Sequence, residues 1–93
     1  MPSIRWSHAA IDDILNIQKY ISRDSPEIAE EFTLKIIEFV EHLETLPNLG
    51  KKIQKYNDPK IRMIIYRNYN IIYQIYEEFL EIVRIIHQSQ DLK

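Results

Sequence analysis

The amino-acid sequence predicts an α+β fold in which a helical hairpin packs on a small twisted antiparallel sheet. Three observations support this expectation. Before residue 47, apolar residues recur every three or four positions, which is typical of amphipathic helices. After residue 59 they form short runs separated by turn residues, which is typical of strands. The only glycine of the chain, Gly50, lies between the two patterns.

Each helix has a recognisable start. A short strand is expected at residues 4–6, and Ser7 is suited to cap the helix that follows. Ser25 and Pro26 predict the start of a second helix, because serine caps well and proline is tolerated in the first turn. We expect this helix to end at Pro47. The short connection between the helices makes them an antiparallel hairpin.

The second half of the chain predicts three strands, at residues 60–66, 71–76 and 80–87. Asparagines follow the first of them and suit a turn. Glu77 and Glu78 lie near the next reversal. Closely spaced turns favour an antiparallel meander, and the short N-terminal strand completes the sheet.

Composition narrows the class of protein. The chain of 93 residues is expected to form a single domain over residues 1–93. It has no cysteine, so neither a disulfide scaffold nor a thiolate metal site is possible. We find no signal peptide and no apolar run of about 18 residues, so we expect a cytoplasmic protein without membrane contact. Nucleotide-binding glycine loops, nucleophile elbows and zinc motifs are missing, and we expect no cofactor and no metal.

The charge is divided unevenly along the chain. Residues 1–50 carry nine acids and four bases, a net charge of −5, whereas residues 51–67 carry a net charge of +5 and residues 68–93 one of −2. The basic stretch could bind a polyanion or an acidic partner, or it could be a solvated edge strand charged against aggregation. Tyrosines near it could stack on bases but are more often core residues: Tyr56, Tyr66, Tyr69, Tyr73 and Tyr76.

Two residues of the last predicted strand could take part in chemistry. His87 could do acid–base work or contact phosphate, or it could be a strand-end histidine with a backbone hydrogen bond. Arg84 is expected on the other face, together with Leu80, Ile82 and Ile86, and needs an anion, a partner carboxylate or a helix acid. An acidic pair on the first helix is interpreted as complementing the helix dipole: Asp12 and Asp13.

Short segments that are individually weak occur in a specific order along the chain: residues 4–7, 10, 13–14, 17, 20–21, 25–26, 29–32, 46–51, 61–62, 66–69, 71–73, 82–87 and 91. This ordered set resembles the RelE/ParE family of toxins from bacterial toxin–antitoxin systems, also known as plasmid stabilisation proteins. The resemblance covers nearly the whole chain. It implies the helical hairpin on a twisted sheet, and a cognate antitoxin that wraps the toxin in a hetero-oligomer.

The family has two branches with different activities. RelE-like members cleave messenger RNA on the ribosome, whereas ParE-like members poison DNA gyrase. This sequence has Ile61 and Met63 where the ribonuclease places lysines, Asn70 where an arginine is typical, and no tyrosine after Tyr76. The ending at residues 87–91 is more similar to ParE. We therefore expect a ParE-like toxin that acts on gyrase by binding rather than by catalysis.

Two alternatives remain open at this point. One is a ribosome-dependent mRNA endoribonuclease, in which Arg62, Arg67 or Lys52 supplies charge for the phosphate and His87 transfers a proton. The other is a non-toxic relic that only binds an antitoxin. In every case the residues expected to contact the target or the antitoxin are the same: Lys51, Lys52, Lys55, Lys60, Arg62, Arg67, Arg84 and His87.

Overall fold

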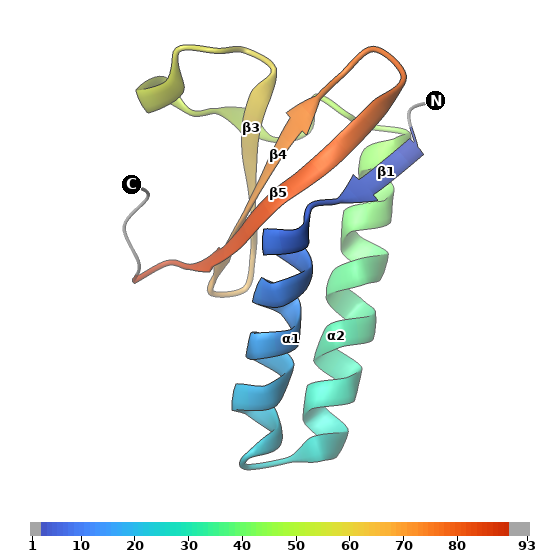
Figure 1. Cartoon of the computed structure of the whole chain (residues 1–93), viewed down its shortest axis with the longest axis vertical. Coiled ribbons are helices and arrows are strands. Elements are labelled where there is room, and N and C mark those ends of the chain that lie inside the picture. Colours follow the sequence, from blue (N-terminus) through green and yellow to red (C-terminus); the bar gives the residue numbers. More distant parts are fainter. Residues whose placement is uncertain (1–2, 90–93) are drawn as a thin grey trace.

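Two helices pack on a five-stranded sheet in the computed structural model, which describes residues 3–89, and this confirms the predicted α+β fold (Figure 1). The elements follow one another along the chain in this order: β1 (Ser3–Trp6), α1 (His8–Ser22), α2 (Pro26–Glu41), a 3₁₀ turn (His42–Glu44), β2 (Lys51–Lys52), a second 3₁₀ turn (Gln54–Tyr56), β3 (Ile61–Tyr66), β4 (Tyr69–Ile75) and β5 (Phe79–His87).

The sheet has the strand order β1-β5-β4-β3-β2. The expected antiparallel meander of β3, β4 and β5 is confirmed. The sheet is mixed rather than wholly antiparallel, however, because β1 runs parallel to β5. A further difference is β2, a strand that the sequence does not predict and that pairs with β3. Two exposed lysines have no alternating pattern from which such a strand could be predicted.

Both predicted helix caps are confirmed. The Ser7 hydroxyl oxygen accepts a hydrogen bond from the Ala10 N–H at 3.0 Å, and the Ser25 hydroxyl oxygen accepts one from the Ile28 N–H at 3.2 Å. The Ser7 hydroxyl also donates to the Val83 carbonyl at 2.8 Å, which fixes the start of α1 to β5. The helix α2 ends before the predicted boundary, and a 3₁₀ turn continues the chain, as is common at helix ends.

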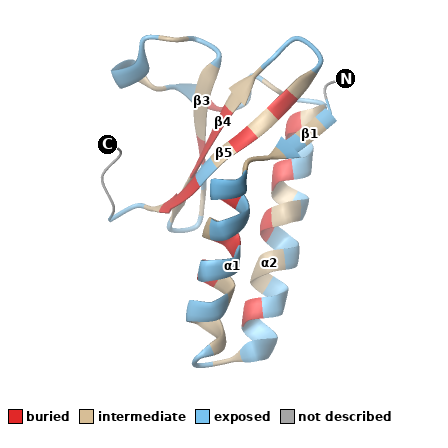
Figure 2. Ribbon diagram, in the orientation of Figure 1, coloured by how far each residue is buried: buried red, intermediate tan, exposed pale blue. Residues whose placement is uncertain are grey.

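The core lies between the helical hairpin and the sheet, on the inward sides of α1 and α2 (Figure 2). Its buried members come from both halves of the chain: Ala10, Ile14, Ile17, Ile36, Val40, Leu43, Ile64, Ile71, Tyr73, Leu80, Ile82 and Ile85. Phe32 packs edge-on against Tyr66 and Tyr69, with ring centroids 5.8 and 5.5 Å away. These tyrosines are therefore packing residues rather than a stacking platform.

Tyr73 joins the two halves of the fold. Its side chain is fully buried, its hydroxyl donates to the Pro47 carbonyl at 2.8 Å, and its oxygen accepts from the Gly50 N–H at 2.7 Å. A Cβ atom added at Gly50 would lie 2.6 Å from the Tyr73 hydroxyl oxygen. The φ angle of Gly50 is not positive, so its backbone conformation does not require a glycine. The close approach of the Tyr73 side chain does.

A β-bulge changes which side chains share a face of β5. Tyr73 pairs with Ile82 but Ile72 pairs with Arg84, so Val83 is the extra residue. Because one residue is inserted, Arg84 lies on the opposite face from Ile82. The expectation that Arg84 shares a face with Leu80 and Ile82 is wrong, since strict alternation holds only in a strand without a bulge, whereas Ile86 does share its face.

Asp13 binds the strand immediately after this bulge. Its carboxylate accepts hydrogen bonds from the Arg84 Nε at 2.7 Å, the Arg84 Nη2 at 3.0 Å and the Ile85 N–H at 2.8 Å. The bond to Asp13 raises the pKa of Arg84 above its ordinary value. The dipole interpretation of Asp12 and Asp13 is wrong, because the first turn of α1 contains no acid. Of the partners expected for Arg84, the structure selects a helix acid.

Replacing Tyr73 by phenylalanine removes both hydrogen bonds of its hydroxyl. We expect the free energy of unfolding to fall by about 1–3 kcal/mol in urea denaturation, because buried backbone groups lose a partner. Tyr56→Phe is the matched control, since Tyr56 lies at the surface in the second 3₁₀ turn, and its effect should stay within about 0.5 kcal/mol. Equal stability of the two variants would contradict the structural role of the Tyr73 hydroxyl.

Alkaline pH provides a second measurement on the same variants. Burial raises the pKa of Tyr73 above the ordinary value of about 10, despite opposing effects of the Gly50 N–H and the Arg62 charge. The folded state therefore favours the neutral phenol, a contribution that is complete below about pH 10 and is lost as the pH rises through the folded value. We expect a shallower alkaline loss of stability in Tyr73→Phe, which retains Tyr69, whose pKa burial also raises.

Removing the Asp13 carboxylate should loosen the contact between α1 and β5. We expect Asp13→Ala to lower the free energy of unfolding by about 1–3 kcal/mol, because the Ile85 N–H loses its acceptor. Arg84→Ala should cost less, about 0–1 kcal/mol, since half of that side chain is exposed. Asp12→Ala, at an exposed neighbouring position, is the control. The assignment fails if thermal unfolding does not distinguish Asp13→Ala from Asp12→Ala.

Candidate functional site

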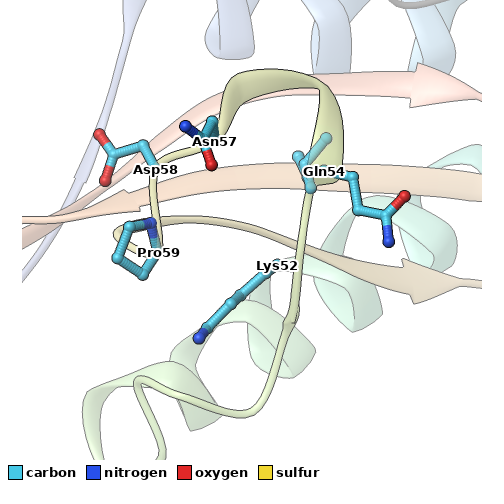
Figure 3. Close-up of a pocket in the computed structure, with 6 residues that line it drawn as sticks. Lys52, Gln54, Asn57, Asp58 and Pro59 are labelled. Atoms are coloured by element: carbon cyan, nitrogen blue, oxygen red, sulfur yellow. The ribbon is translucent and has the colours of Figure 1, made fainter.

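Half of the predicted contact residues lie along one edge of the sheet, which we call the basic edge. It consists of the exposed residues Lys51, Lys52, Lys55 and Lys60. They belong to β2, the second 3₁₀ turn and the approach to β3. The loop between β2 and β3 encloses a hollow of about 390 Å³, and Figure 3 shows Lys52 and Asp58 on its two arms. The chain turns back at Asn57, whose φ of 50° suits asparagine better than most residues.

Arg62 holds the basic edge against the core. It is the cross-strand partner of Tyr73. Its Nε donates to the Pro59 carbonyl at 3.1 Å, and its Nη1 donates to the carbonyls of Gly50 at 2.9 Å and Asn48 at 3.4 Å. The guanidinium thus binds backbone on both sides of β2. Arg62 therefore positions the segments that carry the lysines. The sequence alone does not predict this role.

An apolar groove adjoins the basic edge. Because β2 pairs only with Arg62 and Met63, the outer edge of β3 beyond Met63 has no strand partner in the described part of the chain. A groove of about 360 Å³ lies beside it, and Leu49 and Ile65 in its wall are 52% and 55% exposed. Its lining comes from α2, the crossover between the first 3₁₀ turn and β2 (residues 45–50), β2 and β3: Phe39, Leu49, Lys51, Met63, Ile64 and Ile65. Sequence reasoning missed this groove, although the apolar Leu49 beside the glycine was a local signal.

Arg67 and His87 lie at the other end of the sheet. Arg67 occupies the β3–β4 turn with a φ of 54°, and its guanidinium lies 5.7 Å from the ring centroid of Tyr66. His87 pairs with Tyr69 across the strands. The Nδ1 of His87 accepts a hydrogen bond from the Ser89 N–H at 3.1 Å. His87 is therefore a strand-end histidine with a backbone hydrogen bond.

The structure does not bring Arg62, Arg67 and His87 together as one catalytic group. Arg62 pairs with Tyr73 and His87 pairs with Tyr69, so their partners are four positions apart along β4. At about 3.3 Å per residue this is roughly 13 Å along the strand. Arg67 shares the end of the sheet with His87, and Arg84 is engaged with Asp13. The predicted contact residues are therefore not one cluster. The lysines form the basic edge, whereas Arg67 and His87 lie at the opposite end of the sheet.

Metal-ligating groups, membrane-spanning helices and the C-terminal residues were also considered in the sequence. Among residues 3–89, no group of three or more His, Cys, Asp or Glu side chains could hold a metal ion. Neither helix in this range is long and apolar enough to cross a membrane. The residues Gln90–Lys93, including the Asp91 of the predicted ParE-like ending, lie outside the described part of the chain.

Comparison with known proteins gives two findings. The family described as the ParE toxin of the type II toxin–antitoxin system parDE matches residues 4–92. A structure of the chromosomal ParDE toxin–antitoxin system from P. aeruginosa superimposes with a TM-score of 0.77 at 24% sequence identity, covering 94% of this chain and 96% of that chain. That likeness supports the fold. No curated protein gave a significant match. Because the family match covers almost the entire sequence, this chain belongs to the ParE toxin family of type II toxin–antitoxin systems.

Proposed function

We propose that this chain is a growth-inhibiting toxin that poisons DNA gyrase in the cytoplasm and is neutralised by a cognate antitoxin. The observation that carries the proposal is the family match over residues 4–92. The toxin acts by binding its target rather than by covalent chemistry. Its contact surface includes the basic edge together with Arg62, Arg67, Arg84 and His87.

The positions of the charged residues support binding over RNA cleavage. A ribonuclease needs a proton carrier and cationic groups around one phosphate. In this chain Arg62 donates to three backbone carbonyls, and His87 lies at the opposite end of the sheet. The ribonuclease alternative therefore has less support than the gyrase proposal.

The groove beside β3 is the best docking surface for the antitoxin. Its outer strand edge offers backbone N–H and C=O groups, its walls are apolar, and lysines flank it. An extended antitoxin segment with alternating apolar residues and several acids fits all three features. Such a segment would be disordered alone and would fold on binding.

Charge reversal on the basic edge should weaken the antitoxin complex. The antitoxin is sought as the product of a small adjacent reading frame, co-expressed with this chain. We expect Lys51→Glu with Lys52→Glu to lower the affinity about tenfold and to flatten its salt dependence, because attraction becomes repulsion. Lys19→Glu with Arg23→Glu on α1 is the matched control. Equal affinities of the two variants in titration calorimetry would remove the basic edge from the interface.

The gyrase assignment is tested with purified toxin, gyrase and supercoiled DNA. We expect loss of supercoiling activity and accumulation of cleaved DNA bound to gyrase, both suppressed when the toxin is first mixed with its antitoxin. Messenger RNA isolated during growth arrest should remain intact. Unchanged gyrase activity at a large excess of toxin, together with codon-positioned cuts in ribosome-bound RNA, would replace this function with the ribonuclease alternative.

A further inference from the structure

A second concave surface lies away from the basic edge. It is a cleft of about 600 Å³ between α1, the β3–β4 turn and the end of β5. Its lining combines aromatic, amide, imidazole and hydroxyl side chains: Asn16, Ile17, Tyr20, Asn68, Tyr69, His87 and Ser89. The volume is within the range of pockets that hold small molecules.

One wall of the cleft is a stripe along α1. Asn16, Tyr20 and Arg23 are spaced by four and three residues and therefore share a helix face. Tyr20 is 66% exposed, the highest value among the exposed large hydrophobic side chains in residues 3–89. The Arg23 guanidinium lies 5.9 Å from the centroid of the Tyr20 ring, close enough for a cation–π contact. Core packing does not explain this exposed aromatic ring.

The opposite wall is held in place by hydrogen bonds. The Asn68 carbonyl accepts from the Gln88 N–H at 2.8 Å, which ties the turn to the residue after β5. The Tyr69 and His87 rings meet edge to face, with centroids 5.3 Å apart and planes at 88°. The Ser89 N–H fixes the orientation of His87 through Nδ1. The cleft is therefore built on groups that are already ordered.

Charge and hydrogen-bonding groups indicate the kind of ligand. None of the cleft-lining residues is an acid, although the first half of the chain is strongly acidic. Arg23 places a positive charge 5.9 Å from the Tyr20 ring, and Lys19 precedes Tyr20 in the chain. Two asparagine amides offer donors and acceptors, the combination that matches the edge of a base. Aromatic rings with nearby cations are the usual binding elements for single strands.

We propose that this cleft binds a nucleotide of a single-stranded nucleic acid. The base stacks against Tyr20 and meets the Asn16 and Asn68 amides, and the adjoining phosphate lies near Lys19 and Arg23. The site goes beyond the proposed function, which concerns protein partners, and it requires no bond to be made or broken. DNA and RNA share the recognised chemistry.

The test measures binding of fluorescein-labelled oligothymidine and oligouridine hexamers by anisotropy at low salt. We expect Tyr20→Ala to weaken binding about tenfold, as is typical when one stacked base loses its aromatic partner. The matched control is Tyr56→Ala, because Tyr56 is also exposed but lies beside the basic edge. Since Tyr20 is mostly exposed, Tyr20→Ala should unfold at the temperature of the wild type, and the melting curve checks this.

Each outcome decides the proposal. Loss of binding in Tyr20→Ala, with side-chain amide shifts of Asn16 and Asn68 in NMR spectra, supports it, and a preference for either oligonucleotide identifies DNA or RNA as the source. Wild-type binding in Tyr20→Ala, or loss only in Lys51→Glu with Lys52→Glu, overturns it, as does the lack of binding to either hexamer. Antitoxin affinity is measured separately, so failure here leaves the proposed function unaffected.

Discussion

The two hydrogen bonds of the Tyr73 hydroxyl hold the helical half of the molecule to the sheet. They bind Pro47 and Gly50 at the crossover between the halves, in a buried position where each bond replaces water. Arg62, the neighbour of Tyr73 across the strands, binds the same crossover from its outer side. Two adjacent side chains thus determine where β2 and the lysines lie relative to the core. The position of the basic edge therefore depends on how Tyr73 packs in the core and on the backbone contacts of Arg62.

The charge distribution of the chain is organised by this arrangement. The acids lie mainly on the helical hairpin, whereas the lysines of the basic edge lie on the far strand of the sheet and its loop. Arg62 and Arg84 lie partly or largely at the surface, yet both guanidiniums make hydrogen bonds within the protein. The remaining positive charge suits attraction of an acidic partner over a broad surface, which depends on summed potential more than on the exact position of one group.

The features that could be predicted from the sequence are those determined by residues close together in the chain. Ser7 and Ser25 are helix caps, and the three long strands follow from apolar runs and turn residues. The sequence could not predict the bulge at Val83 or the parallel pairing of β1, because both depend on residues distant in the chain. The position of Gly50 between the helical and strand halves is evident from the sequence. The reason for a glycine there is the close approach of Tyr73, 23 residues away. For the site, the lysines were predicted, whereas the groove required the packing of Phe39 beside β3.

The open edge of β3 has a consequence for the toxin without its antitoxin. A strand edge with unsatisfied backbone groups and apolar neighbours can pair with any extended chain, including a second copy of itself. The lysines of β2 discourage such pairing where β2 lies beside Arg62 and Met63. The exposed Ile65 lies outside the part of β3 that β2 pairs with. An antitoxin segment bound at this edge, as proposed above, would also block such pairing. Its dissociation would uncover the edge, and aggregation would then compete with recapture.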